Sequence, residues 1–153
     1  MIIKKLNLNA KKVDRFINSF LKKQEKTSLI SPMKYGVLSG GKKIRSSIIL
    51  AVGKLYNLNF GKLINVCSAV ECIHSYSLIH DDLPCMDNDK IRRGKPSTHI
   101  KYGEATAVLA GNSLLTLAFE MISDKNFKIN YTSKSKLIHS LAFSELPLIT
   151  LII

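Results

Sequence analysis

Three carboxylates lie within seven consecutive positions of this 153-residue chain, and two adjacent arginines follow them. The carboxylates are Asp81, Asp82 and Asp87, and the arginines are Arg92 and Arg93. Carboxylate oxygens at this density suit Mg²⁺, which binds few protein ligands and shares its shell with water and phosphate. Guanidinium groups match phosphate oxygens in shape and charge. The spacing therefore indicates a site for a complex of magnesium with a diphosphate.

An acidic run is also typical of a solvated protein surface, and composition alone favours that interpretation. The residues that precede the cluster argue against it. From Val70 to Leu83 the chain is mostly apolar and contains no Lys or Arg. A charged surface segment does not normally follow directly on a buried helix, so the flanking sequence favours a ligand site.

A glycine pair followed by cations forms a second candidate site. Gly40 and Gly41 precede Lys42 and Arg45, and the apolar pattern predicts that a helix begins there. Free backbone N–H groups and the helix dipole favour an anion at such a helix start, where the two cations could clamp it. The spacing is not that of a P-loop, so this turn taken alone is a weak signal.

A histidine lies on the predicted helix that leads to the aspartates. Glu71, His74, Leu78 and Asp81 fall on one helical face. At 1.5 Å per residue, His74 lies roughly 10 Å along the helix axis from Asp81. A single histidine on a helix is more often structural than functional, but its place on this face makes the two interpretations about equal.

Helical periodicity dominates the rest of the chain and predicts an all-α fold of one domain. We expect Ser31 to cap a short helix that ends at the glycine pair, and Pro84 to interrupt a long helix. A polar loop should cover residues 90–103, and a last helix should start near residue 132. The almost wholly apolar segment 104–123 should form a central, buried helix. Two further helices have the apolar stripes Val13, Phe16, Ile17, Phe20 and Leu21, and Ile44, Ile48, Ala51, Val52 and Leu55.

The net charge of +12 is confined to the N-terminal part of the chain. Residues 1–62 hold fourteen Lys and Arg against two Asp and Glu, whereas the remaining residues are balanced. Such a basic segment could attract nucleic acid or an anionic membrane, but it lacks aromatic interleaving and a nucleic-acid motif. Lysines on the outer faces of helices explain the charge better, so we expect no nucleic acid as a partner and no membrane insertion.

The cysteines and the two ends of the chain indicate a cytoplasmic protein. Three cysteines are an odd number without C-x-x-C spacing, which favours reduced thiols over disulfides or a zinc site. The N-terminal residues form no secretory apolar segment. The last apolar run, from Leu146 to Ile153, is too short to span a membrane.

Taken together, these segments resemble the trans-isoprenyl diphosphate synthases over roughly residues 10–143. The resemblance rests on the motifs G-G-K-x-x-R, E-x-x-H, S-L-I-H-D-D-L-P-x-M-D and R-R-G-x-P-x-x-H, the last of which ends at His99. It implies the all-α isoprenoid-synthase bundle, with antiparallel helices around a deep cavity. It also implies a prenyltransferase that condenses isopentenyl diphosphate with dimethylallyl or geranyl diphosphate and uses Mg²⁺.

The resemblance also assigns roles to the candidate residues. Asp81 and Asp87 would hold the Mg²⁺ that bridges the allylic diphosphate, with Asp82 as a supporting ligand. Arg92 would contact the same diphosphate. The ligands of isopentenyl diphosphate would be Lys42, Arg45, His74 and Arg93.

Product length is a further implication of the resemblance. In the family, a large aromatic residue five positions before the first aspartate closes the floor of the elongation pocket, and Tyr76 stands there. Pro84 and Cys85 expand the aspartate motif by two residues. This combination resembles enzymes that stop at fifteen carbons, with farnesyl diphosphate as the product.

The sequence departs from the family pattern at Ser46, where Pro is usual, at Asn88, where Asp is common, and in its second half. The family carries a second aspartate-rich motif there, whereas the last aspartate of this chain is Asp124. We therefore expect residues 1–145 to be the N-terminal part of a family domain and residues 146–153 to be an aberrant tail. On this interpretation the chain is a truncated synthase with little activity of its own, which could form a homodimer. The alternative is a non-catalytic helical remnant that binds diphosphate or a partner.

Overall fold

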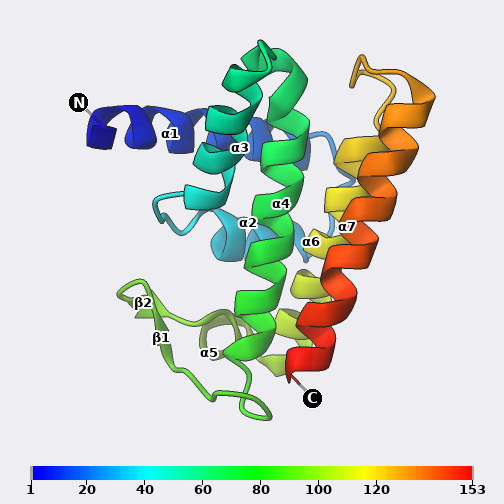
Figure 1. The fold of residues 1–153 in the computed structure, drawn as a ribbon. Coiled ribbons are helices and arrows are strands. Elements are labelled where there is room, and N and C mark those ends of the chain that lie inside the picture. Colours follow the sequence, from blue (N-terminus) through cyan, green and yellow to red (C-terminus); the bar gives the residue numbers. More distant parts are fainter. Residues whose placement is uncertain (1, 153) are drawn as a thin grey trace.

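The computed structural model describes the backbone of residues 2–152 and the side chains of residues 6–143 (Figure 1). The regular elements of this part of the chain are helices and one small hairpin, which confirms the all-α prediction. Helix α4 packs chiefly against α6, and α7 covers another side of α6. The elements are α1 (Ile2–Leu21), α2 (Ile30–Leu38), α3 (Ile44–Leu55), α4 (Phe60–Asp81), β1 (Ile91–Arg92), β2 (Lys95–Pro96), α5 (Thr98–Tyr102), α6 (Glu104–Ser123) and α7 (Tyr131–Ile152).

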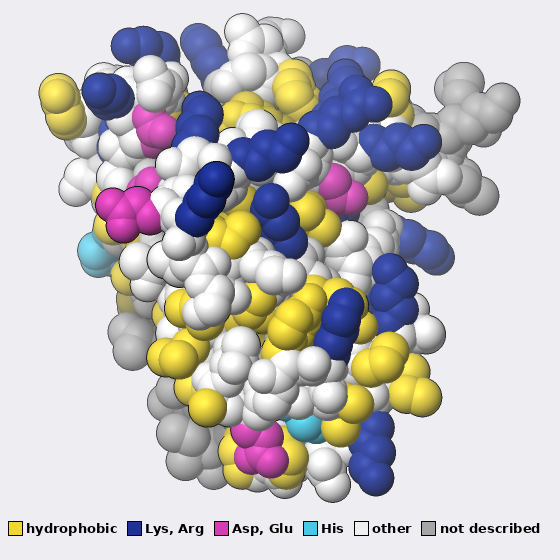
Figure 2. All heavy atoms as spheres, turned by 180° about the vertical axis from the view of Figure 1, so that it is seen from behind, with side chains coloured by type: hydrophobic (Ala, Val, Ile, Leu, Met, Phe, Trp, Pro, Cys, Tyr) yellow, Lys and Arg dark blue, Asp and Glu magenta, His cyan; other side chains and the backbone are white. Residues whose placement is uncertain are grey.

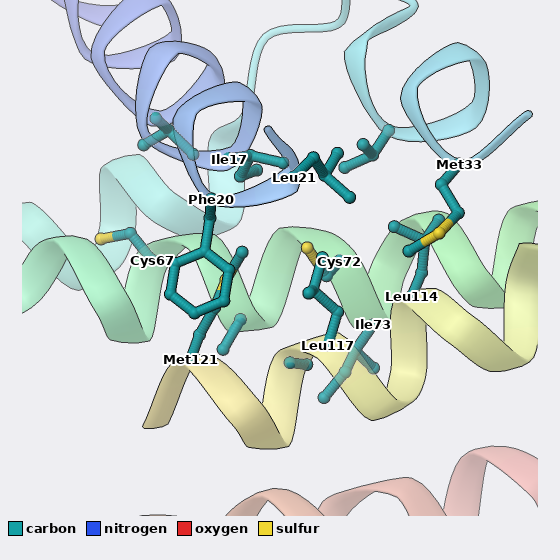
Figure 3. Close-up of a cluster of buried hydrophobic side chains, with 14 of the residues drawn as sticks. Ile17, Phe20, Leu21, Met33, Cys67, Cys72, Ile73, Leu114, Leu117 and Met121 are labelled. Carbon is teal, nitrogen blue, oxygen red and sulfur yellow. The ribbon is translucent and has the colours of Figure 1, made fainter. Parts of the chain in front are cut away.

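The core lies where α1 and α2 meet the pair formed by α4 and α6 (Figure 3). Apolar side chains from these helices point toward one another there, among them Ile17, Cys72 and Leu114. Helix α6 approaches α4 closely at Gly111, because a Cβ at that position would lie 2.3 Å from Nε2 of His80. This close contact holds the part of α4 that leads to the aspartates against a buried neighbour.

Two predicted helices agree with the structure. The segment predicted as the central helix is α6, with the same bounds and with eight buried residues along its length. The stripe of α1 is also confirmed, because Val13 and Ile17 are fully buried and Phe20 and Leu21 are nearly so. Among the described residues, α6 is the one helix long and apolar enough to cross a membrane, and its burial against α4 is that of a core helix.

The apolar stripe predicted for α3 faces solvent and not the core. Ile44 is 53% exposed and Leu55 is 81% exposed, and the rest of that stripe is exposed as well. Helix α3 instead packs against α1 and α4 through the side that carries its small residues Ser46 and Gly53, which are buried. Small residues allow that closer approach, since a Cβ at Gly53 would lie 2.3 Å from a methyl carbon of Leu63.

Two local predictions need correction. Helix α2 begins at Ile30 with Leu29 as its N-cap, so Ser31 lies inside the helix and its hydroxyl is 3.4 Å from that of Tyr102. The segment 90–103 is not a plain loop, because it forms the β1–β2 hairpin and helix α5.

Helix α7 runs through the predicted boundary at residue 145, and the side chains beyond residue 143 lie outside the described ones, so that boundary stays a prediction.

Basic side chains cover the outer faces of the N-terminal helices. Figure 2 shows Lys and Arg spread over the end of the molecule where α1 lies, with few carboxylates among them. The α1 lysines Lys11 and Lys12 are exposed, as surface lysines would be. Two of the three cysteines, Cys67 and Cys72, are free and buried, and burial raises the pKa of each thiol to about 12. These two thiols therefore stay protonated near neutral pH and act as packing residues.

Candidate functional site

The two adjacent arginines lie in a tight hairpin. Strands β1 and β2 pair Arg92 with Lys95, so Arg93 and Gly94 form the two-residue turn between them. Both turn residues have positive φ, 53° and 73°, as a type I′ turn requires. Gly94 adopts this conformation without strain, whereas Arg93 requires contacts elsewhere to hold it.

Arg93 is held by a contact with the glycine turn, which the sequence predicted as a separate anion site. Its Nη1 donates a hydrogen bond to the carbonyl oxygen of Gly40. A Cβ on Gly41 would lie 2.9 Å from Cζ of Arg93, so the guanidinium lies directly on the glycine backbone. Gly41 also has a φ of 104°, which side chains rarely allow. Two basic segments that are 53 residues apart in sequence thus form one surface.

The cations of the glycine turn divide into exposed and buried ones. Lys42 and Arg45 are exposed, as residues that bind a ligand must be. Lys43, which the sequence did not single out, is 4% exposed and has a φ of 46° as the N-cap of α3. Its Nζ donates to the carbonyl oxygen of Val37 at 2.7 Å and lies 3.5 Å from Oδ1 of Asp14. This lysine therefore fixes the turn, and its neighbours remain available.

Glu71 ties the start of α3 to α4. Its carboxylate is 2% exposed and accepts hydrogen bonds from the backbone N and the hydroxyl of Ser46, at 3.1 and 2.8 Å. Its second oxygen is 4.0 Å from Nζ of Lys43. Ser46 makes both of these contacts at the position where the resembled family usually has Pro, which could make neither. Glu71 is thus a structural residue that sets the position of α3.

His74 lies in a strongly cationic environment one turn further along α4. The pKa of His74 is lowered to about 4, first by burial and then by the nearby charge of Arg45, with smaller effects from Arg93 and Lys43. Glu71 alone acts in the opposite direction. The charges of two predicted site residues, Arg45 and Arg93, thus both act on His74. At neutral pH the histidine is therefore uncharged. An uncharged imidazole near cations can donate a hydrogen bond to an anion that those cations attract.

The aspartates separate into a pair and a single residue. The backbone N of Asp87 donates to the carbonyl oxygen of Asp81 at 2.9 Å, so the loop folds back onto the end of α4. Burial raises the pKa of Asp81, and the charge of Asp87 is the second cause. Asp82 instead points to Arg92, whose Nε donates to its Oδ1 at 2.8 Å, and it is 2% exposed. Asp82 therefore anchors Arg92 in this structure, and the role of the three aspartates at a metal stays a prediction.

The paired carboxylates fit a magnesium ion that also binds a diphosphate. Mg²⁺ commonly takes one or two carboxylates and completes its shell with water and phosphate oxygens. Among the described residues, no three side chains of the metal-ligating types lie close enough to form a complete cage. Asp81 and Asp87 thus suit a metal that arrives with its ligand, and the supporting role of Asp82 at that metal stays a prediction.

A small cavity lies beside the two arginines of the hairpin. It lies between α2, α4 and the hairpin, and its volume of about 20 Å³ is room for roughly one water molecule. Polar groups from all three elements line it, including Ser39, Ser75 and Arg93. Tyr76, on the other hand, does not line this cavity. It is partly buried against the core, and its ring meets the edge of the His80 ring at 4.6 Å between centroids.

Comparison with known proteins supports the resemblance seen in the motifs. A model of the polyprenyl synthetase family matches residues 26–145. Farnesyl diphosphate synthase of Buchnera aphidicola from Acyrthosiphon pisum is 49% identical over 121 residues, which are 78% of this chain and 43% of that protein. The Escherichia coli enzyme of the same name is 50% identical over 100 residues, 65% of this chain and 33% of that protein. The chain thus spans less than half the length of these curated relatives.

Solved structures show the same likeness in three dimensions. The crystal structure of an FPP/GFPP synthase from Zymomonas mobilis superposes with a TM-score of 0.87 and is 38% identical. The superposition covers 92% of this chain and 51% of that one. A geranyltranstransferase from Thermotoga maritima gives a TM-score of 0.73 at 42% identity, over 78% of this chain and 45% of that one.

Replacement of Gly41 tests the contact between the two basic segments. Gly41→Ala and Gly40→Ala should each lose of order 1–3 kcal/mol of stability, because both residues have φ near 100°. Only Gly41→Ala should displace the Arg93 guanidinium, since a Cβ at Gly40 meets no atom within 4 Å. The side-chain Nε–H signal of Arg93 in a nitrogen-15 NMR spectrum should move in the first variant and stay in the second. Equal spectra for both variants would show that the two segments are not in contact.

The pKa of His74 provides a second test. Proton NMR should find the imidazole titrating near pH 4, and Arg45→Gln should raise that pKa part of the way toward 6.5. Because the unfolded state binds the proton more readily, the free energy of unfolding should rise with pH between about 4 and 6.5. Titration of the wild-type ring at its ordinary pKa, unaffected by Arg45→Gln, would contradict the cationic site.

Proposed function

This chain belongs to the polyprenyl synthetase family, and from that premise we propose that it binds two diphosphates as the substrates of prenyl transfer. Isopentenyl diphosphate occupies the surface between the glycine turn and the hairpin. An allylic diphosphate with Mg²⁺ occupies the aspartate end of α4. The observation that carries this proposal is the contact of Arg93 with Gly40, because it brings the basic segments together beside the aspartates.

The isopentenyl diphosphate site consists of Lys42, Arg45, His74 and Arg93. The first two are exposed on the glycine turn, and Arg93 has further N–H donors beyond the one that Gly40 accepts. The low pKa of His74 keeps its ring neutral, so it offers a hydrogen bond and adds no charge. Several fixed donors around one position suit the many oxygens of a diphosphate.

The allylic diphosphate site consists of Asp81, Asp87 and Arg92. A Mg²⁺ ion held by the two carboxylates would supply positive charge that favours departure of the diphosphate. Arg92 is half-exposed and has N–H groups beyond those bound to Asp82 and Asp89. In this proposal Asp82 orients Arg92 toward the substrate, in place of the supporting role at the metal that the family resemblance implied.

The reaction follows from the placement of these charges. Arg92 stabilises the negative charge that grows on the leaving diphosphate as the allylic C1–O bond breaks. The double bond of isopentenyl diphosphate, which the basic site orients, then forms a carbon–carbon bond with the allylic cation, and a proton is lost. The apolar residues along α4 and α6 keep water from the cation.

Product length is part of the same proposal. Tyr76 lies on α4 more than one turn before Asp81, with its ring fixed against His80. A bulky ring at that depth limits the growing chain, and we assign a fifteen-carbon product, farnesyl diphosphate. The names of the relatives from Buchnera and Escherichia coli support this length.

The cellular compartment and the oligomeric state are also part of the proposal. All three cysteines are free, which suits the cytoplasm. A homodimer is proposed from the family resemblance.

A second candidate function is diphosphate binding without turnover, and one observation favours it. The residues that match the Buchnera relative cover 43% of that protein, so more than half of its length is not represented in the match.

Binding of a geranyl diphosphate analogue tests the proposal directly. Calorimetry should show binding that requires Mg²⁺ and that is lost in Asp81→Ala combined with Asp87→Ala, because the metal then has no carboxylate ligand. Asp124→Ala, beyond the far end of α6, is the matched control and should bind as the wild type does. Binding that persists without Mg²⁺ or without both carboxylates would refute the allylic site. Turnover of radiolabelled isopentenyl diphosphate distinguishes transfer from binding alone.

A further inference from the structure

We propose that Tyr35 is a positioning residue for the diphosphate site, because its hydroxyl holds the arginine hairpin against α2 and so keeps Arg93 in place. This inference rests on the proposed function, since it concerns the same site. The hydroxyl donates a hydrogen bond to the carbonyl oxygen of Pro96 at 2.7 Å. Pro96 ends strand β2, three residues after Arg93 and opposite Ile91. Tyr35 carries no charge and lines the small cavity between α2, α4 and the hairpin together with Arg93.

The Tyr35 ring is fixed on both of its sides. The ring of Tyr102 meets it edge to face, with centroids 5.5 Å apart and planes at 72°. The ammonium group of Lys101 lies 3.9 Å from the centroid of the Tyr35 ring. Edge-to-face pairs and cation–π contacts each favour a single ring orientation. The hydroxyl is therefore held in position before any ligand arrives, and it costs little entropy to keep its hydrogen bond.

Among the described residues, the glycine turn and helix α2 before it each share a hydrogen bond with the hairpin segment, and only the bond from α2 is independent of the ligand. The first is the bond from Arg93 to the carbonyl oxygen of Gly40, which involves a guanidinium that the ligand also needs. The second is the bond from Tyr35 to Pro96, which joins two uncharged groups. When a diphosphate draws on the donors of Arg93, the Tyr35 bond remains unchanged. It therefore keeps the turn close to the glycine segment while the arginine binds.

The backbone conformation of Arg93 makes this support necessary. A non-glycine residue with a φ of 53° is less stable than in a β or α conformation, so the turn tends to rearrange if the hairpin loosens. At the base of the hairpin, the N of Ser97 donates to the carbonyl oxygen of Lys90 at 2.9 Å. That bond closes the hairpin but does not attach it to α2. Tyr35 provides the attachment.

The variant Tyr35→Phe removes only the hydroxyl and tests the proposal with isopentenyl diphosphate as the calorimetric probe. The affinity should fall about threefold to tenfold, the equivalent of one neutral hydrogen bond. Tyr102→Phe is the matched control, because its ring belongs to the same cluster but its hydroxyl faces Ser31 on α2. It should bind as the wild type does. In an Arg93→Ala background, Tyr35→Phe should have no further effect, since Tyr35 acts through Arg93.

Hydrogen exchange provides a readout that needs no ligand. The Ser97 amide should exchange faster in Tyr35→Phe than in the wild type and in Tyr102→Phe. Unchanged affinity, or an equal loss in the Arg93→Ala background, would overturn the positioning role. If the wild-type chain binds no isopentenyl diphosphate, the proposed function fails by itself. The exchange of Ser97 then still decides whether Tyr35 holds the hairpin, and an unchanged rate would overturn that as well.

Discussion

The contact between the Arg93 guanidinium and the backbone at Gly40 and Gly41 is the constraint on which the rest of the site depends. It joins segments that are 53 residues apart, and it requires glycine at position 41 for two reasons. A side chain there would strike Cζ of Arg93 at 2.9 Å, and the φ of 104° disfavours one in any case. Without this contact the glycine turn and the hairpin would be two weak anion sites. With it, the two basic segments form one surface, as the proposed diphosphate site requires.

Charges that serve the fold are neutralised inside it, which leaves others available for a ligand. Lys43 is buried against Asp14 and Glu71, and Asp82 is buried against Arg92, which is itself partly exposed. Next to each buried charge lies a residue of the same kind that is more accessible: Lys42 beside Lys43, and Asp81 beside Asp82. Adjacent like charges thus divide between structural and binding roles. Burying a charge is tolerable only where a partner is present, so the paired member is the buried one.

The sequence predicted the helices and the family well, but not which member of each charged pair is buried. The sequence located α6 correctly, because a long segment that is apolar almost all round is expected to form a buried helix. The stripe of α3 was equally periodic, yet it is exposed, because periodicity identifies a face and not what covers it. Strands of two residues are too short to show alternation, so the hairpin was missed. Lys43 could not be told from Lys42 because its burial follows from a φ of 46° at the start of α3. The pairing of Asp82 with Arg92 likewise depends on how the loop folds.

The central claim is that the glycine turn and the hairpin form one diphosphate site. A double-mutant cycle with Lys42→Ala and Arg93→Ala, read as the affinity for isopentenyl diphosphate, tests it most directly. If both cations bind the same diphosphate, each single variant should weaken binding at least tenfold. The combined loss should also depart from the sum of the two by more than about 0.5 kcal/mol. An unaltered affinity in Arg93→Ala, or strictly additive losses, would contradict a shared site.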